Sequence, residues 1–348
     1  MSSGNLEHFP VMLDKILSII TPQHGGTFID CTFGAGGYTK AILNFPNTKV
    51  IALDRDRSVN LHANFLTQKY NKRLKFYNNK FSQIDKISEG NKSINAIILD
   101  LGFSMFQMKN LSRGFSFNSK GPLDMRMGFN DFGANKVINK LDQKEIELIL
   151  KYFGEEKYNK RIAFQIINLR KKKEIDTQDL VKIINKVKKK KTYGRINEAT
   201  KSFQALRIFV NNEISELIFG LINATKKLKI GSMLVVVTFH SLEDKIVKYY
   251  FKTYSEKNKN PSRYIPESVK EDKRLFHCPQ KKPLIASKKE IFLNPPSRSA
   301  KLRYVIRNSN KFIFPKDLIN KFQSYLDIES IGLKLWKVLF YSFYLFVV

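Results

Sequence analysis

A glycine-rich turn between two apolar segments constrains the fold of this chain more than any other feature. The apolar residues Phe28–Ile29 lead into the turn Gly34-Ala35-Gly36-Gly37, and a helix is expected over Thr39–Leu43. A second apolar segment, Val50–Leu53, ends at Asp54. Strand, glycine turn, helix, strand and acid, in this order, are typical of the first half of a nucleotide-binding α/β unit. Asp54 follows Gly34 by 20 residues, where a carboxylate that binds ribose hydroxyls is expected.

The ligand of this turn belongs to one of two classes. A dinucleotide needs its pyrophosphate at the helix N-terminus and usually has the spacing G-x-G-x-x-G. This chain has Gly34-x-Gly36-Gly37 instead. S-adenosylmethionine carries no phosphate and needs only a close backbone and an acid for its ribose, which suits Asp30–Gly37 followed by Asp54. A tight turn without a ligand is the structural alternative, and the ordered strand, turn, strand and acid make it less favoured.

Further apolar segments extend the pattern into a sheet. Strands are expected at Leu74–Tyr77, Ile94–Asp100, Ser232–Phe239 and Leu302–Arg307. Helices are expected over 11–20, 57–70, Glu145–Phe153, Lys160–Arg170, Gln178–Val187 and Lys245–Phe251, and residues 254–300 are expected to be loop. We therefore predict an α/β fold with a mostly parallel sheet and a helical insert of about a hundred residues between strands four and five. The expected division is a core of 1–107 and 226–310, an insert of 108–225 and an extension of 311–348.

The excess of positive charge indicates what kind of binding partner this chain has. The chain has 61 lysines and arginines against 31 acids, a net charge of +30. A lysine-rich composition with a solvated surface is the alternative explanation, but the scarcity of acids favours a polyanionic partner, with nucleic acid ahead of a membrane surface. Two cysteines, Cys31 and Cys278, build no disulfide framework. The polar residues Met1–Pro10 do not resemble a secretion signal, so a cytoplasmic location is expected.

Two residues mark the carboxyl ends of predicted strands, where open parallel sheets bind their ligands. Asp100 ends the fourth strand and His240 follows the fifth. A buried acid is costly unless it is paired or used, and a turn or cap residue before Gly102 is the alternative for Asp100. For His240, a structural and a catalytic role are equally compatible with the sequence.

The segment Arg113-Gly114-Phe115-Ser116-Phe117 combines a cation with aromatic residues. Such a pattern suits stacking on a base and binding of phosphate, and inward packing of the rings in an ordinary loop is equally compatible with the spacing. His277-Cys278 has no second histidine or cysteine pair at metal-ligand spacing, so no metal site is expected.

The last residues form a hydrophobic tail. Residues 338–348 are eleven mostly apolar residues, short of the ~20 that span a bilayer. A segment that starts at Ile331 is interrupted by Lys334 and Lys337. A docked helix, an edge strand and a membrane contact are the alternatives, with membrane contact the least favoured.

Taken together, these motifs resemble those of a known family. The matching segments are His8–Asp14, Asp30–Thr39, Ala52–Asp56, Leu99–Ser104, Arg113–Phe117, Gly121–Met127, Tyr152–Glu156, Phe203–Ile208, Ser241–Asp244 and Asn294–Arg303. They resemble the bacterial small-subunit ribosomal RNA (cytosine-N4) methyltransferases, the RsmH/MraW family, in order over residues 5–308. The resemblance implies a class I, Rossmann-like methyltransferase core with a helical insert. It also implies S-adenosylmethionine as donor and a cytosine in the decoding region of small-subunit (16S) rRNA as acceptor.

The resemblance further implies a set of donor-binding residues, in which Asp54 holds the ribose. These residues are Gly36, Gly37, Tyr38, Asp54, Phe81, Asp100 and Gln107. Three features depart from the family pattern. Tyr38 replaces the usual histidine, Ser104-Met105-Phe106-Gln107 replaces a Ser-Ser-Pro-Gln or Ser-Ser-Met-Gln run, and residues 311–348 extend beyond the usual end.

The expected reaction is direct transfer of the sulfonium methyl to the exocyclic amine of cytosine, which requires no metal and no covalent enzyme intermediate. The catalytic candidates are Asp100 and Ser104 as acceptors for the amine protons and His240, which takes up the proton or orients the base. The base must be unstacked to enter the pocket. The residues expected to contact RNA are Phe103, Phe115 and Phe117 around the base and Arg113, Arg126 and Arg207 on phosphates.

Two other functions remain as alternatives. A basic RNA-binding or ribosome-assembly protein with a vestigial donor pocket fits the charge, and an NAD-dependent oxidoreductase fits the glycine turn. The expected partner is small-subunit rRNA or an assembling small subunit. The sequence leaves open the assembly state of that subunit and the oligomeric state of the chain, with a homodimer as one option.

Overall fold

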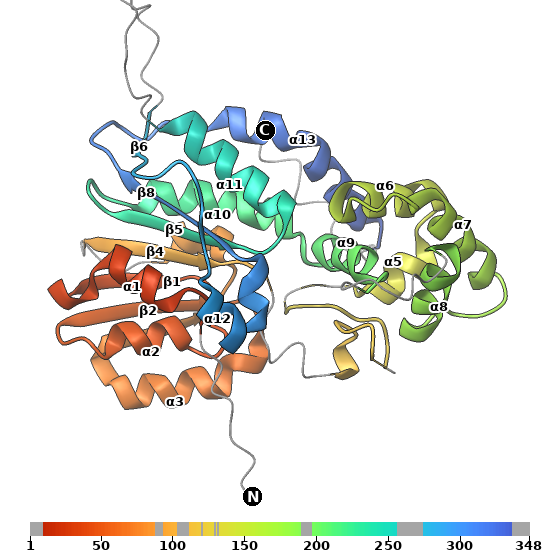
Figure 1. The fold of residues 1–348 in the computed structure, drawn as a ribbon, viewed down its shortest axis with the longest axis horizontal. Helices are drawn as coiled ribbons and strands as arrows, with labels where there is room; N and C mark the ends of the chain where they lie inside the picture. The colour runs from red at the N-terminus through yellow and green to blue at the C-terminus, as the bar shows by residue number, and fades with distance from the viewer. Residues whose placement is uncertain are drawn as a thin grey trace, which may run out of the picture. The chain divides into compact units, whose positions relative to one another are not determined.

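The computed structural model describes residues 10–87, 93–102, 111–119, 121–128, 130, 132–188, 197–255 and 274–335. The chain divides into two compact units (Figure 1), and each is described by itself. Unit 1 comprises Met1–Ser104 and Glu216–Lys321, and unit 2 comprises Met105–Ser215 and Phe322–Val348. Residues of the C-terminal extension therefore belong to both units.

The described part of unit 1 is built on a sheet whose strands follow the order β3-β2-β1-β4-β5-β8-β6, with β7 also paired to β8. Strands β1 to β5 are parallel, and β8 runs antiparallel to β5. The strands are β1 (Gly26–Asp30), β2 (Thr48–Asp54), β3 (Leu74–Asn78), β4 (Ile94–Asp100), β5 (Met233–Thr238), β6 (Phe276–His277), β7 (Leu284–Ile285) and β8 (Lys301–Arg307). This order confirms the predicted mostly parallel α/β fold, in which the helical insert separates β4 from β5 in sequence only.

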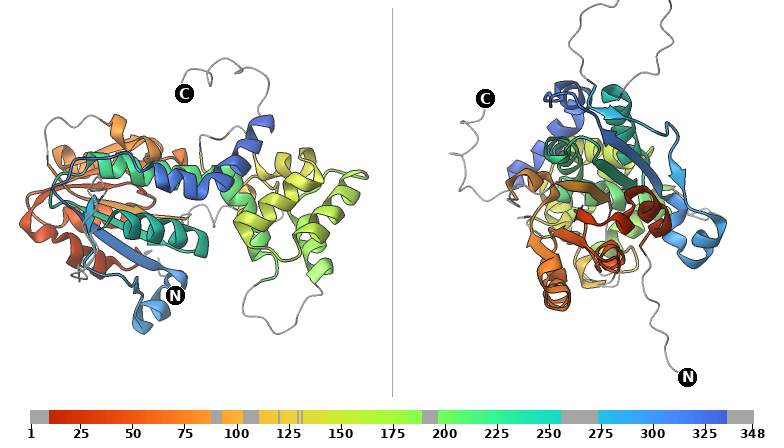
Figure 2. Two further views of the ribbon diagram at one scale, coloured as in Figure 1. Left: turned by 90° about the horizontal axis from the view of Figure 1, so that it is seen from above. Right: turned by 90° about the vertical axis from the view of Figure 1, so that its left-hand side faces the viewer.

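Helices cover both faces of this sheet. Figures 1 and 2 show α2 and α3 on one side of the strands and α10 and α11 on the other. The helices with residues in unit 1 are α1 (Leu13–Ile20), α2 (Gly37–Leu43), α3 (Asn60–Tyr70), α10 (Glu213–Lys227), α11 (Ser241–Tyr254), α12 (Lys288–Leu293) and α13 (Lys316–Ser330). The sheet is thus buried on both sides, which explains why β4 is almost wholly apolar in sequence.

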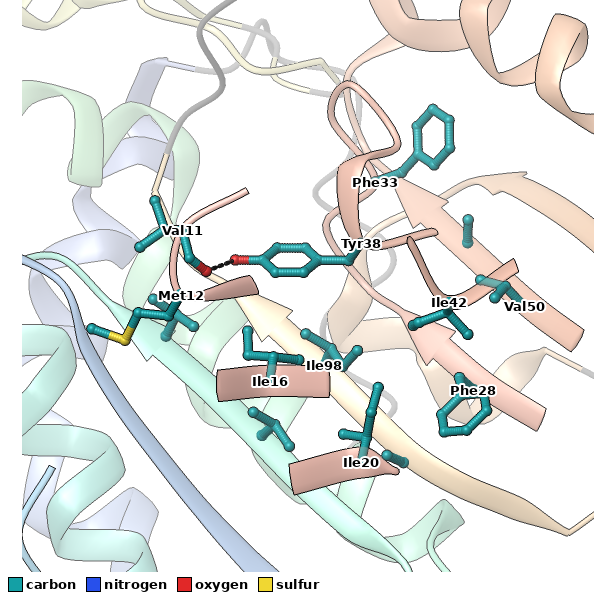
Figure 3. Packing of buried hydrophobic residues seen from close by; sticks show 14 of the residues in the cluster. Val11, Met12, Ile16, Ile20, Phe28, Phe33, Tyr38, Ile42, Val50 and Ile98 are labelled. Atoms are coloured by element: carbon teal, nitrogen blue, oxygen red, sulfur yellow. Dashed lines mark hydrogen bonds between the residues drawn. The ribbon is translucent and has the colours of Figure 1, made fainter. Parts of the chain in front are cut away.

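One hydrophobic cluster joins the sheet to the glycine turn (Figure 3). Phe28 of β1 and Ile98 of β4 lie in this cluster, and the fully buried Ile16 of the amphipathic helix α1 belongs to it as well. Phe33 and Tyr38, on either side of the turn, are also members. Burial of each such large side chain contributes roughly 1.5–3 kcal/mol, so the turn is held by the core of unit 1.

The described part of unit 2 is largely helical. Its helices include α5 (Ala134–Lys140), α6 (Gln143–Gly154), α7 (Asn159–Arg170), α8 (Thr177–Lys188) and α9 (Thr200–Asn211). Helix α6 begins with a capping box between Asp142 and Glu145. At Gly154 a Cβ atom would lie 2.5 Å from the carbonyl oxygen of Lys201 in α9. A side chain at Gly154 would therefore prevent this close approach of α6 and α9.

The prediction that residues 254–300 are loop is wrong for the described residues 274–300. Strands β6 and β7 pair with β8, and α12 and the 3-10 helix η6 (Pro295–Ser299) follow. Strands of two residues are too short to show an alternating pattern in the sequence, and α12 has only six residues. Residues 256–273 lie outside the described part of the chain.

Part of the extension beyond residue 310 forms a helix, α13. In unit 2 the ring of Tyr325 lies 5.7 Å from that of Tyr152, edge to face, and 6.2 Å from that of Phe153. Among the described residues, no helix combines the length and the apolar character needed to cross a membrane. The tail 338–348, for which a docked helix, an edge strand or a membrane contact is predicted, lies outside the described residues.

Glu329 of α13 binds the first turn of α10. Its two carboxylate oxygens accept hydrogen bonds from the backbone N–H groups of Ile214 and Ser215, at 2.8 and 2.9 Å. A helix N-terminus leaves such groups without an internal partner, and its dipole favours a carboxylate there. Burial raises the pKa of Glu329 to about 7. The extension therefore supplies a buried cap to another helix.

Glu329→Ala is expected to lower the free energy of unfolding by about 1–3 kcal/mol, because it leaves two buried N–H donors without an acceptor. Thermal and urea unfolding at pH 8, where the carboxylate is ionised, would measure the effect. Asp327→Ala, which changes an exposed acid of the same helix, is the matched control and should cost under about 0.5 kcal/mol. Equal unfolding curves for the two variants would contradict the assigned cap.

Candidate functional site

The carboxyl ends of three neighbouring strands in unit 1 each carry an aspartate. Asp30 ends β1, Asp54 ends β2 and Asp100 ends β4. The chain reverses its direction of travel across the sheet between β1 and β4, and open α/β sheets bind ligands at such a point. Among the described residues, no lysine or arginine forms an ion pair with any of the three acids. The site is therefore locally acidic although the chain as a whole is strongly basic.

The glycine turn is shaped by its contacts with protein. Gly36 has a φ of +69°, and a Cβ atom there would lie 2.8 Å from Leu66 and 3.0 Å from the ring of Phe33. A Cβ atom at Gly37 would lie 2.4 Å from Pro10. Neither position therefore tolerates a side chain as the turn stands. The predicted contact of both glycines with a donor stays a prediction.

Asp54 holds this turn through its side chain. Oδ2 accepts a hydrogen bond from the backbone N–H of Gly34 at 2.8 Å, and Oδ1 accepts one from Asp56 at 2.8 Å. Burial raises the pKa of Asp54 to about 6, against the effect of these two hydrogen bonds. Asp54, the predicted ribose-binding residue, therefore also stabilises the glycine turn by accepting a hydrogen bond from it.

Asp30, for which no role is predicted from the sequence, is fully buried. Its Oδ1 accepts a hydrogen bond from the backbone N–H of Thr32 at 3.2 Å, and its Oδ2 accepts one from the Thr39 hydroxyl at 2.7 Å. Burial raises the pKa of Asp30 to about 6. Asp30, like Asp100, is an acid at the end of a buried strand. The same signal in the sequence would therefore have identified Asp30 as a candidate site residue.

Asp100, on the outer strand β4 of the three, lies in an unusual environment. Its backbone N–H donates to the Thr32 hydroxyl at 2.9 Å, while its buried Oδ1 has no hydrogen-bond partner in the described structure. Burial raises the pKa of Asp100 well above its ordinary value, and the charges of Asp30 and Glu243 act in the same direction. A hydrogen bond with Tyr38 opposes them. A buried carboxylate oxygen without a partner is costly, and Oδ1 would suit a ligand group that donates a hydrogen bond.

Tyr38 is predicted to contact the donor, and its hydroxyl is already engaged by the protein. It donates to the Val11 carbonyl oxygen at 2.5 Å (Figure 3), and its ring is buried. A hydroxyl has a single proton, so Tyr38 can donate either to the Val11 carbonyl oxygen or to the Asp100 carboxylate, but not fully to both.

His240 caps helix α11. Its Nδ1 accepts from the Glu243 backbone N–H at 3.4 Å, and Glu243 Oε2 accepts from the backbone of Phe239 at 2.8 Å. With Nδ1 as acceptor, the neutral ring carries its proton on Nε2, which lies 3.1 Å from Glu243 Oε1. Nε2 makes no hydrogen bond with a described residue, although Glu243 Oε1 lies near it. The two predicted roles of His240, proton uptake and orientation of the base, both stay predictions.

Phe81 opens the 3-10 helix η4 (Phe81–Lys86) after β3, within the same unit as the three acids. Its ring lies where a Cβ atom of Gly220 would fall, at 2.5 Å. Three other predicted site residues, Phe103, Ser104 and Gln107, lie outside the described residues.

The residues predicted to contact RNA in unit 2 make contacts with other residues of the same unit. Arg113 lies 5.3 Å over the ring of Phe115, which is buried. Phe117 packs edge-on against Phe203 at 6.5 Å. Inward packing, the alternative considered for this segment, therefore describes both rings.

The two remaining arginines differ in exposure. Arg126 is exposed and pairs with Asp124 at 2.5 Å. Arg207 is buried and makes two hydrogen bonds of 2.9 Å with Glu213. Contact of Arg207 with phosphate would require this buried pair to open, so Arg126 is the better placed of the two for RNA.

Comparison with known proteins identifies the family. Residues 5–308 match the family described as the MraW methylase family. This chain belongs to the MraW methylase family. It is 42% identical over 304 residues to the ribosomal RNA small subunit methyltransferase H of Ehrlichia canis, covering 86% of this chain and 99% of the relative. The protein of that name from Bartonella bacilliformis is 42% identical, with coverage of 88% and 91%.

Solved structures align with this chain at low identity. An rRNA methylase from Streptococcus thermophilus aligns with 10% identity and a TM-score of 0.34, covering 84% of this chain and 96% of that one. The N-methyltransferase NodS from Bradyrhizobium japonicum, in complex with S-adenosylhomocysteine, aligns with 8% identity and a TM-score of 0.36, with coverage of 88% and 94%.

Proposed function

We propose that this chain transfers a methyl group from S-adenosylmethionine to the exocyclic N4 amine of a cytosine in small-subunit ribosomal RNA. Membership in the MraW methylase family and relatives named ribosomal RNA small subunit methyltransferase H support the reaction class and the RNA. The net charge of +30 suits a polyanionic substrate. Because that substrate is ribosomal RNA, we place the reaction in the cytoplasm.

The observation that carries the choice of donor is the acidic edge formed by Asp30, Asp54 and Asp100. S-adenosylmethionine has a sulfonium and an ammonium group against one carboxylate, so its net charge is positive. A dinucleotide carries a negative pyrophosphate, which three acids without a cationic partner would repel. The electrostatics therefore favour the sulfonium donor over NAD. The unpaired Oδ1 of Asp100 adds an acceptor at the same edge.

The donor, when bound, supplies an electrophilic methyl group and a neutral leaving group. Asp54 accepts hydrogen bonds from the ribose hydroxyls, and the turn at Gly36 and Gly37 brings backbone close to the ligand. Tyr38, Phe81 and Gln107 complete the binding site. The chief task of the protein is alignment, which contributes up to ~7–11 kcal/mol in well-oriented reactions.

Asp100 is the residue that we assign to the target amine. An ionised Asp100 would accept an N–H of the cytosine amine and hold its nitrogen in line, with Ser104 as a second acceptor. As the N–C bond forms and the S–C bond breaks, the same carboxylate would take up the proton that the nitrogen loses. Burial raises the pKa of Asp100, so the donor-free site keeps the acid protonated to a higher pH than a solvent-exposed aspartate. A positively charged ligand beside it favours the ionised form. Donor binding thus prepares Asp100 to accept the hydrogen bond.

The proposed contacts with the flipped base and its neighbours come from the insert and from two core residues, Phe103 and His240. Phe103, Phe115 and Phe117 are the proposed aromatic contacts, and Arg113, Arg126 and Arg207 the proposed phosphate contacts, of which Arg126 is the most exposed. His240 orients the base. These assignments follow the family resemblance of the segments.

Calorimetry of the purified full chain tests the donor class. We expect micromolar or tighter binding of S-adenosylmethionine and S-adenosylhomocysteine and no binding of NAD. Binding of NAD alone would support the oxidoreductase. Donor binding without any methyl transfer to small subunits would support a vestigial pocket in an assembly protein.

Donor affinity is expected to depend on pH with a midpoint near 6. The folded-state pKa values of Asp30 and Asp54 are raised to about 6, so both acids are protonated below that value, and the cationic donor favours their ionised forms. Affinity is therefore lost as pH falls through 6, to about tenfold weaker at pH 5 than at pH 8.

Titration calorimetry at constant ionic strength measures this dependence. S-adenosylhomocysteine, which lacks the sulfonium charge, is the control and should show a weaker dependence. A donor Kd that is unchanged between pH 5 and pH 8 would contradict the proposed role of the acids.

A further inference from the structure

A basic and apolar surface lies on α12 and the segments that flank it, outside the proposed catalytic residues. Phe292 is 85% exposed, and Leu293 and Ile285 are each 64% exposed. Five exposed cations surround them, so that the surface, here named the α12 surface, comprises Ile285, Phe292, Leu293, Lys281, Lys282, Lys288, Lys289 and Arg298.

The helix places its charges beside its apolar side chains. Lys288 precedes Phe292 by four residues, and Lys289 precedes Leu293 by four. Residues four apart on a helix are neighbours on its surface. Cations and apolar groups therefore alternate on the exposed side of α12, instead of separating into two faces.

The positive charges of the α12 surface are not compensated. None of its five cations forms an ion pair with an acid among the described residues. Glu290 is the one acid in the segment Lys281–Arg298, and its Oε1 accepts the backbone N–H of Met12 at 2.5 Å. That carboxylate is thus occupied by the protein, and the surface presents uncompensated positive charge to solvent.

The α12 surface lies at the same sheet edge as the donor site. Strand β8 is antiparallel to β5, and its first residue, Lys301, pairs with Thr238 at the carboxyl end of β5. Helix α12 and η6 come immediately before β8 (Figure 1). Glu290 anchors α12 to Met12, whose neighbour Val11 accepts the Tyr38 hydroxyl beside the glycine turn. The α12 surface and the proposed donor site therefore share the carboxyl edge of the sheet.

We propose that the α12 surface binds single-stranded RNA that flanks the target nucleotide, with a base stacked on Phe292 and phosphates on Lys288 and Lys289. The inference rests on the proposed function. Proteins that bind single strands combine aromatic platforms with a positive groove. A second copy of the chain is a less suitable occupant, because its own α12 surface carries the same positive charge and would repel the first. A helix that lies in a membrane interface needs a continuous apolar face, and six residues are too few to provide one.

Two variants of the full-length chain test the α12 surface in steady-state methyl transfer to small ribosomal subunits. Phe292→Ala should raise the KM for subunits about tenfold, as expected for the loss of one stacked base. Its kcat and its Kd for S-adenosylmethionine should stay within about twofold, because Phe292 does not touch the donor. Lys288→Ala/Lys289→Ala should raise KM and lower the slope of log KM against log salt by about 1.4, because each phosphate contact on a single strand contributes about 0.7.

Matched controls replace similar groups elsewhere in unit 1. Ile230→Ala removes an apolar side chain that is 71% exposed beside the amino end of β5, and Lys248→Ala/Lys252→Ala removes two exposed lysines of α11. Both controls should retain the wild-type KM. A KM for Phe292→Ala equal to that of Ile230→Ala would overturn the proposal.

Two parallel measurements separate the remaining outcomes. Filter binding of an unmethylated rRNA fragment tests the surface even if the wild type transfers no methyl group, a result that would refute the proposed function alone. Sedimentation and binding to phosphatidylglycerol vesicles are measured for the same variants. A change in oligomeric state or vesicle binding at unchanged RNA affinity would overturn the RNA assignment.

Discussion

Asp100→Asn is expected to lower the rate of methyl transfer by about 10²–10³-fold at saturating donor and subunit. The amide keeps the size of the side chain but loses the negative charge that holds the cytosine amine. Its NH2 group can also point toward the amine as a second donor. Donor affinity should fall by about tenfold or less, because Asp54 and the glycine turn are unchanged. Transfer at the wild-type rate would contradict the role of Asp100.

The same substitution is expected to stabilise the donor-free protein. The folded-state pKa of Asp100 is raised, so its contribution to stability is present at low pH and is lost as pH rises through that raised value. Asparagine does not ionise, so the variant keeps the stability that the wild type loses when Asp100 ionises. The melting temperature of the variant at pH 8 should therefore be higher than that of the wild type. Asp244→Asn is the control of opposite sign, because Arg303 at 2.8 Å and Lys301 at 3.1 Å hold the Asp244 carboxylate in ion pairs. A higher melting temperature with lower activity would mark Asp100 as functional.

Asp54→Asn is expected to raise the Kd for S-adenosylmethionine about 100-fold. Two charge-assisted hydrogen bonds to the ribose are weakened, each worth about 1.5–3 kcal/mol. The amide can also accept only one of the two backbone N–H groups, from Gly34 and Asp56, that the carboxylate binds now. The glycine turn therefore loses a support together with its ligand contact.

Asp85→Asn makes the same chemical change at an exposed position of η4 and serves as the control. Calorimetry of both variants distinguishes the effect of losing the Asp54 contact on donor affinity from the effect of removing one negative charge from the protein. At saturating donor, Asp54→Asn should recover at least a tenth of the wild-type kcat, unlike Asp100→Asn. An unchanged donor Kd for Asp54→Asn would remove Asp54 from the donor site.

Long apolar strands and the acids that end them could be predicted from the sequence alone. Strand β4 matches its predicted range, Ile94–Asp100, because burial on both faces makes every position before the edge apolar except the exposed Asn95. The glycine turn and Asp54 could be predicted because they lie at the expected spacing along the chain, with Asp54 20 residues after Gly34. The helical insert is visible because the strand pattern stops after Asp100 and resumes near Met233.

Contacts between distant residues could not be predicted from local patterns. Glu329 caps a helix that begins more than a hundred positions earlier, and nothing near it in the sequence indicates this partner. The Tyr38 hydroxyl and the Val11 carbonyl are 27 positions apart. The spacing around Phe115 allowed both an exposed and a buried ring, and only tertiary packing decides between them. Strands β6 and β7 exist because β8 offers them an edge, not because of their own sequence.

The central claim is tested most directly by mapping the product on the RNA. Small subunits that lack the modification are incubated with the protein and S-adenosylmethionine labelled in its methyl group, and the rRNA is digested and analysed by mass spectrometry. We expect label at one cytosine, on its N4 atom, and none with Asp100→Asn. Label on another base, on carbon 5 of cytosine, or on no nucleotide of the small-subunit rRNA would contradict the account.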